Sequence, residues 1–248
     1  MKKKLVWLLA ILFISLNVSA ERVSLKASDG FQLAANFVDA GSNAKFGVLM
    51  LHQCNADKSM YSDLAKLLGE QNVTSLALDF RGFADSTTPT FSRKLLRKES
   101  KNRKEFMNKI KAVNKFWQGD VELAYEYLAD KIGSDNISII GASCGGYQAV
   151  KFSQKIKPQS LVLFSSGLDE KGIASFNHIS EIPALIIASQ DDAYTFNSSN
   201  KIFLSAKSPK TRLLVYKGNG HGRPLFKHDP NLENIMVDWF LTRASSDK

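Results

Sequence analysis

Short apolar segments alternate with amphipathic segments along most of this chain, and this alternation constrains its fold more than any other feature. Apolar runs as long as a β-strand occur at residues 46–51, 73–80, 136–140, 160–164, 184–188 and 212–216. Between them, apolar residues recur at helical spacing at residues 60–68, 117–128 and 232–240. Strands that alternate with helices predict a largely parallel sheet covered by helices on both faces.

Two further strands precede this pattern. Residues Val23–Lys26 and Phe31–Val38 are joined by Ser28-Asp29-Gly30, and a turn of the Asp-Gly type between two such segments predicts an antiparallel hairpin. The hairpin brings the number of expected strands to eight and makes the sheet mixed. We therefore expect an α/β fold with a mostly parallel, eight-stranded sheet.

Residues that directly follow strands are the candidates for chemistry, because ligands of such sheets bind beyond the carboxyl ends of the strands. One of them is Ser143, in the stretch Gly141-Ala142-Ser143-Cys144-Gly145, between the strand at 136–140 and a helix predicted at 146–156. A serine on a sharp turn between a strand and a helix, with small neighbours, is typical of the nucleophile elbow of serine hydrolases. Ser143 is therefore the predicted nucleophile.

An elbow of this kind requires an acid and then a histidine, each placed after a later strand. Asp191 and Asp192 follow the strand at 184–188, and His221 lies in a glycine-rich loop after the strand at 212–216. His221 is the predicted general base. Asp192 is the preferred acid that orients the imidazole, and Asp191 is the alternative.

From about Lys45 to the C-terminus, the chain resembles the α/β-hydrolase superfamily and, within it, the dienelactone hydrolase-like branch. The resemblance is carried by the segments VLMLHQCNADKSMYSDLAKLL, LALDFRGFADS, GASCGG, IIASQDD and GNGHG. They resemble, in turn, the oxyanion loop with its flanking strand and helix, a structural Asp-x-Arg-Gly turn, the elbow, the acid turn and the histidine loop. The dienelactone hydrolases themselves have a cysteine where this chain has Ser143. The resemblance therefore implies hydrolysis without implying lactone specificity.

The resemblance also implies which backbone groups form the oxyanion hole. In the superfamily, one N–H group belongs to the residue after His-Gly and the other to the residue after the nucleophile, and these positions are Cys54 and Cys144 here. Gln53 stands where glycine is usual. With both cysteines at one hole, two states are open: a Cys54–Cys144 disulfide, which an oxidising compartment would favour, or two buried free thiols.

Together these residues predict a hydrolase that cleaves an ester, a thioester or a lactone of a small molecule through an acyl-enzyme on Ser143. The same triad also serves peptidases and C–C bond hydrolases, and a non-catalytic binding protein on this fold is the alternative of another class. Two cysteines are too few for a four-ligand zinc cluster, and we predict neither a metal nor a cofactor. His52 ends a buried strand and is expected to be structural, while His178 is expected at the surface.

The N-terminus predicts export. Three lysines at positions 2–4 precede an apolar run from Leu5 to Leu16, which the small-residue stretch 17–20 follows. This apolar run is shorter than the roughly 20 residues of a membrane-spanning helix, and the whole pattern is typical of a secretory signal peptide. We expect residues 1–20 to be cleaved, and residues 21–248 to form one periplasmic or secreted α/β-hydrolase domain.

The positive charge of the chain is concentrated in one segment. The composition is ordinary for a globular protein, with 44% apolar and 23% charged residues. The net charge is +9, however, and residues 92–115 alone contain ten basic and two acidic residues. We interpret residues 86–116 as a solvated basic insertion. Two alternatives stay open: contact with a membrane surface through residues 92–115, and a lid over the site that favours anionic substrates. Only Phe91 and Phe106 interleave these charges, which argues against a nucleic-acid partner.

Overall fold

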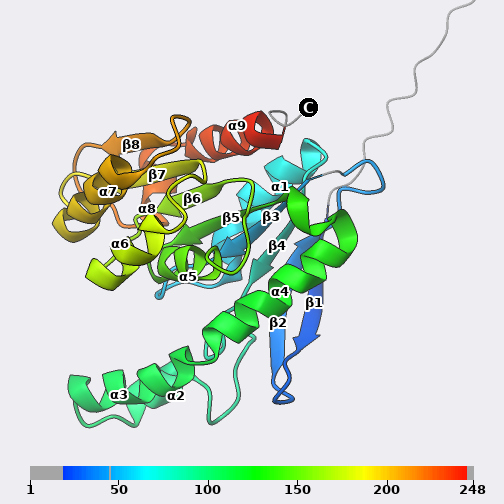
Figure 1. Ribbon diagram of the computed structural model, residues 1–248. Helices are drawn as coiled ribbons and strands as arrows, with labels where there is room; N and C mark the ends of the chain where they lie inside the picture. The colour runs from blue at the N-terminus through cyan, green and yellow to red at the C-terminus, as the bar shows by residue number, and fades with distance from the viewer. Residues whose placement is uncertain (1–18, 45, 245–248) are drawn as a thin grey trace, which may run out of the picture.

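The computed structural model describes residues 19–44 and 46–244, and it contains one eight-stranded sheet (Figure 1). The strands are β1 (Ala20–Lys26), β2 (Gln32–Val38), β3 (Gly47–Leu51), β4 (Thr74–Leu78), β5 (Ile137–Ala142), β6 (Leu161–Phe164), β7 (Ala184–Ser189) and β8 (Arg212–Tyr216). Their order across the sheet is β1-β2-β4-β3-β5-β6-β7-β8. β2 pairs antiparallel with both β1 and β4, and the remaining neighbours pair in parallel. The predicted mixed sheet is confirmed.

Helices cover both faces of this sheet (Figure 1). The α-helices are α1 (Ser62–Glu70), α2 (Arg93–Lys98), α3 (Arg103–Asn114), α4 (Trp117–Ile132), α5 (Cys144–Phe152), α6 (Glu170–Asn177), α7 (Ala193–Ser205), α8 (Pro224–His228) and α9 (Leu232–Ala244). Two short 3-10 helices, η1 (Lys58–Tyr61) and η2 (Ser134–Asn136), precede α1 and β5. None of the described helices has the length and apolar character that crossing a bilayer requires.

Each face of the sheet has its own hydrophobic core. On one face, α4, α5, α6 and α7 bury apolar side chains such as Trp117, Phe152 and Phe176 against the strands. On the other face, α1 and α9 contribute residues such as Leu64 and Phe240. The central strands β3 to β7 are buried along their whole length, as expected for strands with helices on both sides.

The register of the parallel strands brings distant loops to one edge. Leu51, the last residue of β3, pairs with Leu78 of β4 on one side and with Gly141 of β5 on the other. Ala142 in turn pairs with Phe164, which ends β6. The chain therefore leaves β3, β4, β5 and β6 at the same edge, and we call this the catalytic edge.

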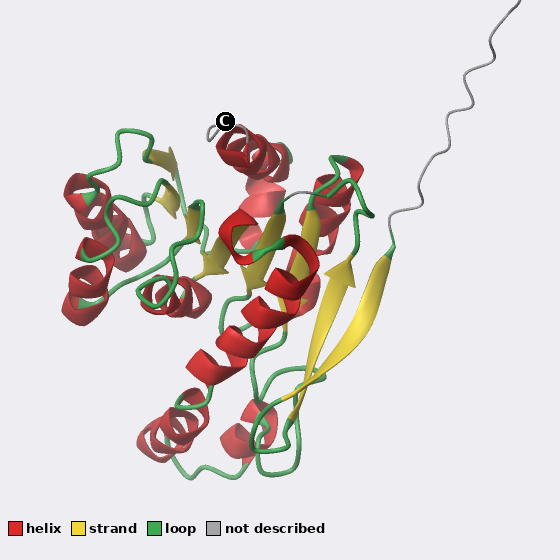
Figure 2. Cartoon of the chain, turned by 45° about the vertical axis from the view of Figure 1, so that its right-hand side comes forward, coloured by secondary structure: helices red, strands yellow, loops and turns green. Residues whose placement is uncertain are grey.

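The insertion predicted over residues 86–116 is largely helical, and neither of its helices was predicted. The Ser92 hydroxyl accepts from the Leu95 N–H group at the start of α2, and the Asn102 side chain accepts from the Glu105 N–H group at the start of α3. α3 buries one face, which consists of Phe106, Ile110 and Val113. Figures 1 and 2 show that both helices project away from the sheet, beyond the carboxyl end of β4.

Two other segments differ from expectation. α6 occupies the stretch between β6 and β7, for which no helix was predicted. The sequence suggests a helix that begins near Asn197, and this helix, α7, begins at Ala193, directly after Asp192. The predicted signal peptide falls almost entirely on residues 1–18, which lie outside the described residues, and β1 begins at Ala20.

Candidate active site

Ser143 lies on the sharp turn between β5 and α5. Its φ of 51° and ψ of −115° form a combination that residues with a side chain rarely adopt. The turn is so tight that a Cβ atom at Gly141 would lie 2.4 Å from the Gly145 carbonyl oxygen. A Cβ atom at Gly145 would lie 2.3 Å from the carbonyl oxygen of Leu51. The glycines around Ser143 are therefore what allows the strand and the helix to meet.

Ser143, His221 and Asp192 form one hydrogen-bonded chain. His221 Nε2 lies 2.8 Å from Ser143 Oγ, and His221 Nδ1 lies 2.6 Å from Asp192 Oδ2. Asp191 has an exposed side chain, and its backbone N–H group donates to the Gly218 carbonyl. Of the two candidate acids, the geometry thus places Asp192 against the imidazole. A carboxylate that accepts from Nδ1–H leaves Nε2 free to take the serine proton.

Asp192 has a second partner that sequence reasoning did not identify. Thr195 is buried in the first turn of α7, and its hydroxyl donates to Asp192 Oδ2 at 2.5 Å. Asp192 directly precedes α7 and makes no side-chain capping bond with that helix. The Thr195 hydroxyl therefore helps to hold the carboxylate toward His221. A threonine three residues after the acid, at the start of a helix, is the sequence signal that could have indicated this contact.

Cys54 and Cys144 form a disulfide, with their Cα atoms 5.8 Å apart. The structure thus contains the bridged form, one of the two states that the sequence left open. Cys144 is the first residue of α5, and N–H groups in the first helical turn have no acceptor within their helix. The Cys54 N–H group donates to no backbone carbonyl within the described chain. The bridge therefore holds two available N–H donors close to the Ser143 turn.

Gln53 connects the loop after β3 to the histidine loop. Its side chain is only 2% exposed, and its Oε1 atom accepts from the backbone N–H group of Arg223 at 2.7 Å. Its Nε2 atom donates to Asn55 Oδ1. On the other side of the same loop, Ser165 Oγ accepts from the Gly222 N–H group at 2.9 Å. Gly222 and Arg223, the two residues that follow His221, are therefore held by side chains from the loops after β6 and β3.

His52 has a structural environment. Its ring is fully buried, Nε2 accepts from the Phe80 N–H group at 3.0 Å, and Nδ1 lies 2.8 Å from the Gln53 carbonyl oxygen. Burial lowers the pKa of His52, which favours the neutral ring that these two contacts require. The structure does not bring the other two histidines to Ser143. His178 caps the end of α6 at the surface, and the ring of His228 contacts Tyr216.

The Asp-x-Arg-Gly turn after β4 stabilises the loops around the site. Asp79 is fully buried and accepts from both the backbone N–H group and the Nζ atom of Lys58, at 2.8 and 2.6 Å. Burial by itself lowers the pKa of Lys58, but its ion pairs with Asp79 and Asp85 raise that pKa overall. The buried guanidinium of Arg81 pairs with Asp29 and Asp120. This turn has a structural role, as the resemblance implies.

A cavity of about 320 Å³ opens beside Ser143. Its lining combines triad residues with two aromatic rings and one acidic side chain: Ser143, Cys144, Tyr147, Gly167, Asp169, Tyr194, Thr195 and His221. The insertion over residues 86–116 contributes nothing to this lining. The arrangement of the insertion as a lid with cationic side chains over the substrate is therefore not present in the structure. Asp169 contributes the carboxylate in this lining.

Known proteins resemble this chain in both sequence and structure. The uncharacterized protein YfhR of Salmonella typhi is 24% identical over 92% of this chain and 83% of its own length. Among solved structures, an esterase of Pyrococcus furiosus is 14% identical, with a TM-score of 0.67 over 92% of each chain. A dienelactone hydrolase of Anabaena variabilis, also 14% identical, has a TM-score of 0.67 over 92% of this chain and 99% of its own.

The family assignment rests on both the sequence and the fold. A family model described as the alpha/beta hydrolase fold matches residues 48–171, which is half of the 248-residue chain. That segment begins in β3 and includes the elbow at Ser143. The strand order, the turn at Ser143 and the matched segment together show that the chain belongs to the α/β-hydrolase family.

Proposed function

We propose that the protein is an exported serine hydrolase that cleaves an ester, a thioester or a lactone of a small molecule. The observation that carries this proposal is the hydrogen-bonded chain from Ser143 through His221 to Asp192. It ends at a hydroxyl that faces a cavity with two tyrosine rings. The solved structures named above as an esterase and a dienelactone hydrolase share the fold.

The proposed reaction has two halves. His221 Nε2 removes the proton from Ser143 Oγ as the oxygen attacks the substrate carbonyl, and the resulting imidazolium then protonates the leaving alcohol or thiol. The product of this half is an acyl-enzyme on Ser143. In the second half, His221 activates a water molecule, which releases the acid and restores the serine. Asp192 keeps the imidazole in the required tautomer throughout.

The backbone N–H groups of Cys54 and Cys144 stabilise the oxyanion in this proposal. Donors that are fixed before the reaction lower the barrier because they need no reorganisation when charge develops on the carbonyl oxygen. The disulfide supplies this rigidity, since it links the two donor residues directly. The bridge is also consistent with export, because disulfides persist in oxidising compartments.

Export is tested by the N-terminus of the natural protein. Sequencing of the protein recovered from fractionated cells is expected to give Glu21 as the first residue, in a periplasmic or extracellular fraction. Recovery of a chain that still begins at residue 1 in the cytosolic fraction would contradict export without affecting the proposed chemistry.

The chemistry is tested by comparing the wild type with Ser143→Ala. We expect the wild type to hydrolyse p-nitrophenyl esters and to react covalently with a fluorophosphonate probe, and Ser143→Ala to do neither. Ser42→Ala makes the same substitution at an exposed serine outside the site, and should still react with the probe. A wild type that is folded but neither turns over any ester in a panel of chain lengths nor reacts with the probe would favour the binding-protein alternative.

A further inference from the structure

We propose that the α2–α3 insertion is a docking surface for anionic lipid headgroups, and we call residues 92–116 the basic protrusion. This inference does not depend on the proposed hydrolase activity. It starts from charge: of the ten basic side chains in residues 92–115, only Lys109 forms an ion pair among the described residues, with Glu105. Of the other nine, Arg93 is half-buried, and the remaining eight are exposed and available to an external anion.

The basic protrusion is an ordered platform. The Arg93 N–H group donates to the Gly82 carbonyl at 2.9 Å, and the guanidinium of Arg93 lies over the rings of Phe83 and Phe106. Arg97 stacks on the same Phe106 ring. These contacts connect α2 and α3 to the turn after β4. A surface that is already ordered loses little conformational entropy when it binds.

The exposed face of the basic protrusion mixes cations with apolar side chains. Leu95, Met107 and Phe116 are 37%, 41% and 38% exposed. Lys104, Met107 and Lys111 lie at positions i, i+3 and i+7 of α3, and therefore on one face of the helix. Lysines that surround a few apolar groups suit a bilayer interface, where the apolar groups enter and the ammonium groups stay with the headgroups. A single-stranded nucleic acid would instead favour several exposed aromatic rings for base stacking, and within residues 92–116 Phe116 is the one such ring.

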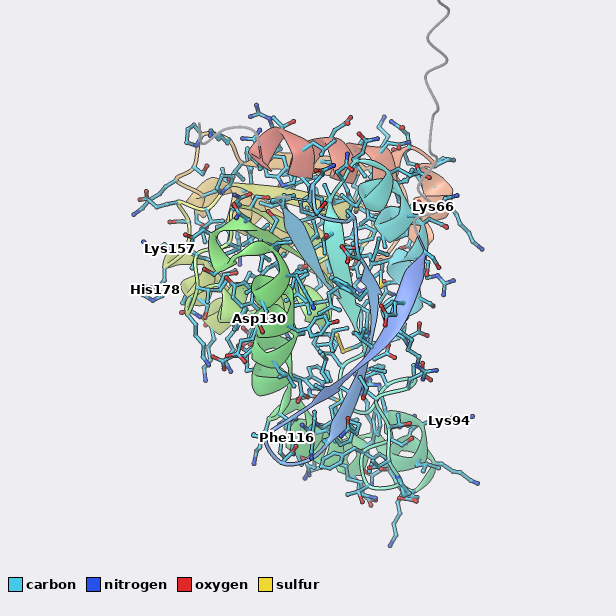
Figure 3. All side chains as sticks on the ribbon, turned by 90° about the vertical axis from the view of Figure 1, so that its right-hand side faces the viewer. Lys66, Lys94, Phe116, Asp130, Lys157 and His178 are labelled. Atoms are coloured by element: carbon cyan, nitrogen blue, oxygen red, sulfur yellow. A yellow bond between two sulfur atoms is a disulfide. The ribbon has the colours of Figure 1, made fainter. Side chains whose placement is uncertain are left out.

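The position of the basic protrusion would orient the enzyme on the membrane. The insertion leaves β4 at the catalytic edge, because Leu78 and Gly141 pair with the same residue of β3. Figure 3 shows Lys94 and Phe116 at one end of the molecule, far from Lys66 and Lys157. Docking through this end turns the catalytic edge, rather than the opposite edge of the sheet, toward the lipid. Each cation near an anionic surface adds attraction that salt weakens.

The test is co-sedimentation of the protein with vesicles of phosphatidylcholine that either contain or lack phosphatidylglycerol. A charge-reversal variant changes four lysines of the basic protrusion: Lys94→Glu, Lys98→Glu, Lys104→Glu and Lys111→Glu. A control with the same net charge changes four exposed lysines elsewhere: Lys66→Glu, Lys157→Glu, Lys171→Glu and Lys210→Glu. We expect binding only to the anionic vesicles, an at least tenfold loss in the first variant, and a much smaller loss in the control. Equal losses in the two variants, or no binding by the wild type, would overturn the proposal.

A second pair of measurements separates lipid from other polyanions. Leu95→Ser combined with Met107→Ser keeps every charge and removes two of the exposed apolar groups. This variant is expected to lose several-fold in affinity for anionic vesicles, and to bind a single-stranded oligonucleotide as weakly as the wild type does. Wild-type protein that binds the oligonucleotide more tightly than the vesicles would refute a lipid surface. Thermal melting checks that the charge-reversal variant and the Leu95→Ser/Met107→Ser variant are folded as the wild type is.

Different contacts carry a second inference, which rests on the proposed function: Gln53 is a positioning residue for His221. Its buried Oε1 atom is the acceptor for the Arg223 N–H group, two residues beyond His221. Gly222 lies between them with a φ of +66°, and a Cβ atom there would lie 1.9 Å from Gln53 Oε1. The histidine loop thus packs directly against the glutamine, and glycine at position 53 could not make this contact.

The loop after β3 that contains Gln53 and Cys54 therefore contacts both the histidine loop and the turn at Ser143. Residue 53 holds the histidine loop, and the neighbouring Cys54 is bonded to the residue after the nucleophile. The distance between His221 Nε2 and Ser143 Oγ therefore depends on this one loop. Because a shift of about 1 Å in a catalytic group can cost up to a hundredfold in rate, loss of the Gln53 contact should affect kcat more than KM.

The experiment compares Gln53→Met, which keeps the bulk and removes the acceptor, with Gln53→Glu, which keeps an acceptor oxygen. We expect Gln53→Met to lower kcat about tenfold with KM within twofold of the wild type, and Gln53→Glu to restore much of kcat. A Gln53→Met enzyme with wild-type kcat would overturn the positioning role, while loss of activity in Ser143→Ala would still support the proposed function. Equal impairment in both Gln53 variants, with lowered melting temperatures, would show a merely structural residue.

Discussion

Replacing Cys54 with alanine removes the disulfide while leaving the backbone N–H group at position 54 in place. The bridge closes a loop between residues that are 90 positions apart. In the chain-entropy description, removing the bridge raises the entropy of the unfolded chain and lowers the free energy of unfolding by about 4.6 kcal/mol at 25 °C. For a chain of this length, each kcal/mol corresponds to about 2–4 °C in melting temperature. We therefore expect Cys54→Ala to melt about 9–18 °C below the oxidised wild type.

The same reasoning makes a prediction about catalysis. Removing one oxyanion donor outright typically costs about 10²–10³ in kcat. The alanine variant retains the donor at position 54 but no longer bonds its loop to residue 144, so a smaller loss of about tenfold in kcat is expected, with little change in KM. Cys144→Ala breaks the same bridge, and its loss of stability should match that of Cys54→Ala.

The assay is thermal unfolding by calorimetry, together with ester hydrolysis, for both variants and for the wild type before and after reduction. Thiol titration of the denatured protein gives the control: none should be found before reduction and two after it. A fully reduced wild type that melts within about 2 °C of the oxidised form would refute the entropic reasoning. Two thiols in the untreated, exported protein would refute the bridge itself.

Three further predictions concern acidic residues. Asp192→Asn should lower kcat about 10³–10⁴-fold because the wrong histidine tautomer is favoured, whereas Asp191→Asn should stay within twofold; equal losses would contradict the choice of acid. Asp169→Asn removes the negative charge from the cavity lining and should raise kcat/KM for anionic esters about two- to fivefold relative to neutral ones; unchanged discrimination would show that this carboxylate does not reach the substrate. The hydrogen bond from Arg81 lowers the pKa of Asp29. Its stabilisation is therefore present above the ordinary aspartate pKa near 4 and is lost as the pH falls through the lower folded-state value. The difference in melting temperature between the wild type and Asp29→Asn should close in acid, and a widening difference would refute this.

Much of the fold follows from local signals. Apolar runs such as 46–51 and 184–188 have the length and uniformly apolar character of central strands, and the Asp-Gly turn indicates the hairpin that begins the sheet. In the insertion, α3 has an apolar stripe that is visible in the sequence and was overlooked, but α2 was missed for a physical reason. Charged residues dominate α2, which buries none of its residues, so no apolar stripe marks it in the sequence. Its order comes from the local cap at Ser92 and from the tertiary packing of Arg93 against aromatic rings.

The sequence alone was enough to predict which residues form the candidate site, because an elbow serine, a later acid and a later histidine must follow strands in that order. Only the tertiary structure decided between Asp191 and Asp192. Both follow the same strand in the sequence, and only the direction of their side chains shows that Asp192 contacts His221. The tertiary structure also decided the state of the two cysteines. Whether residues 90 positions apart can bond depends on the distance between their Cα atoms, which strand register and the elbow set at 5.8 Å. The contact of Gln53 with the histidine loop is of the same kind, because it joins residues 170 positions apart that meet only when β3 and β8 lie in one sheet.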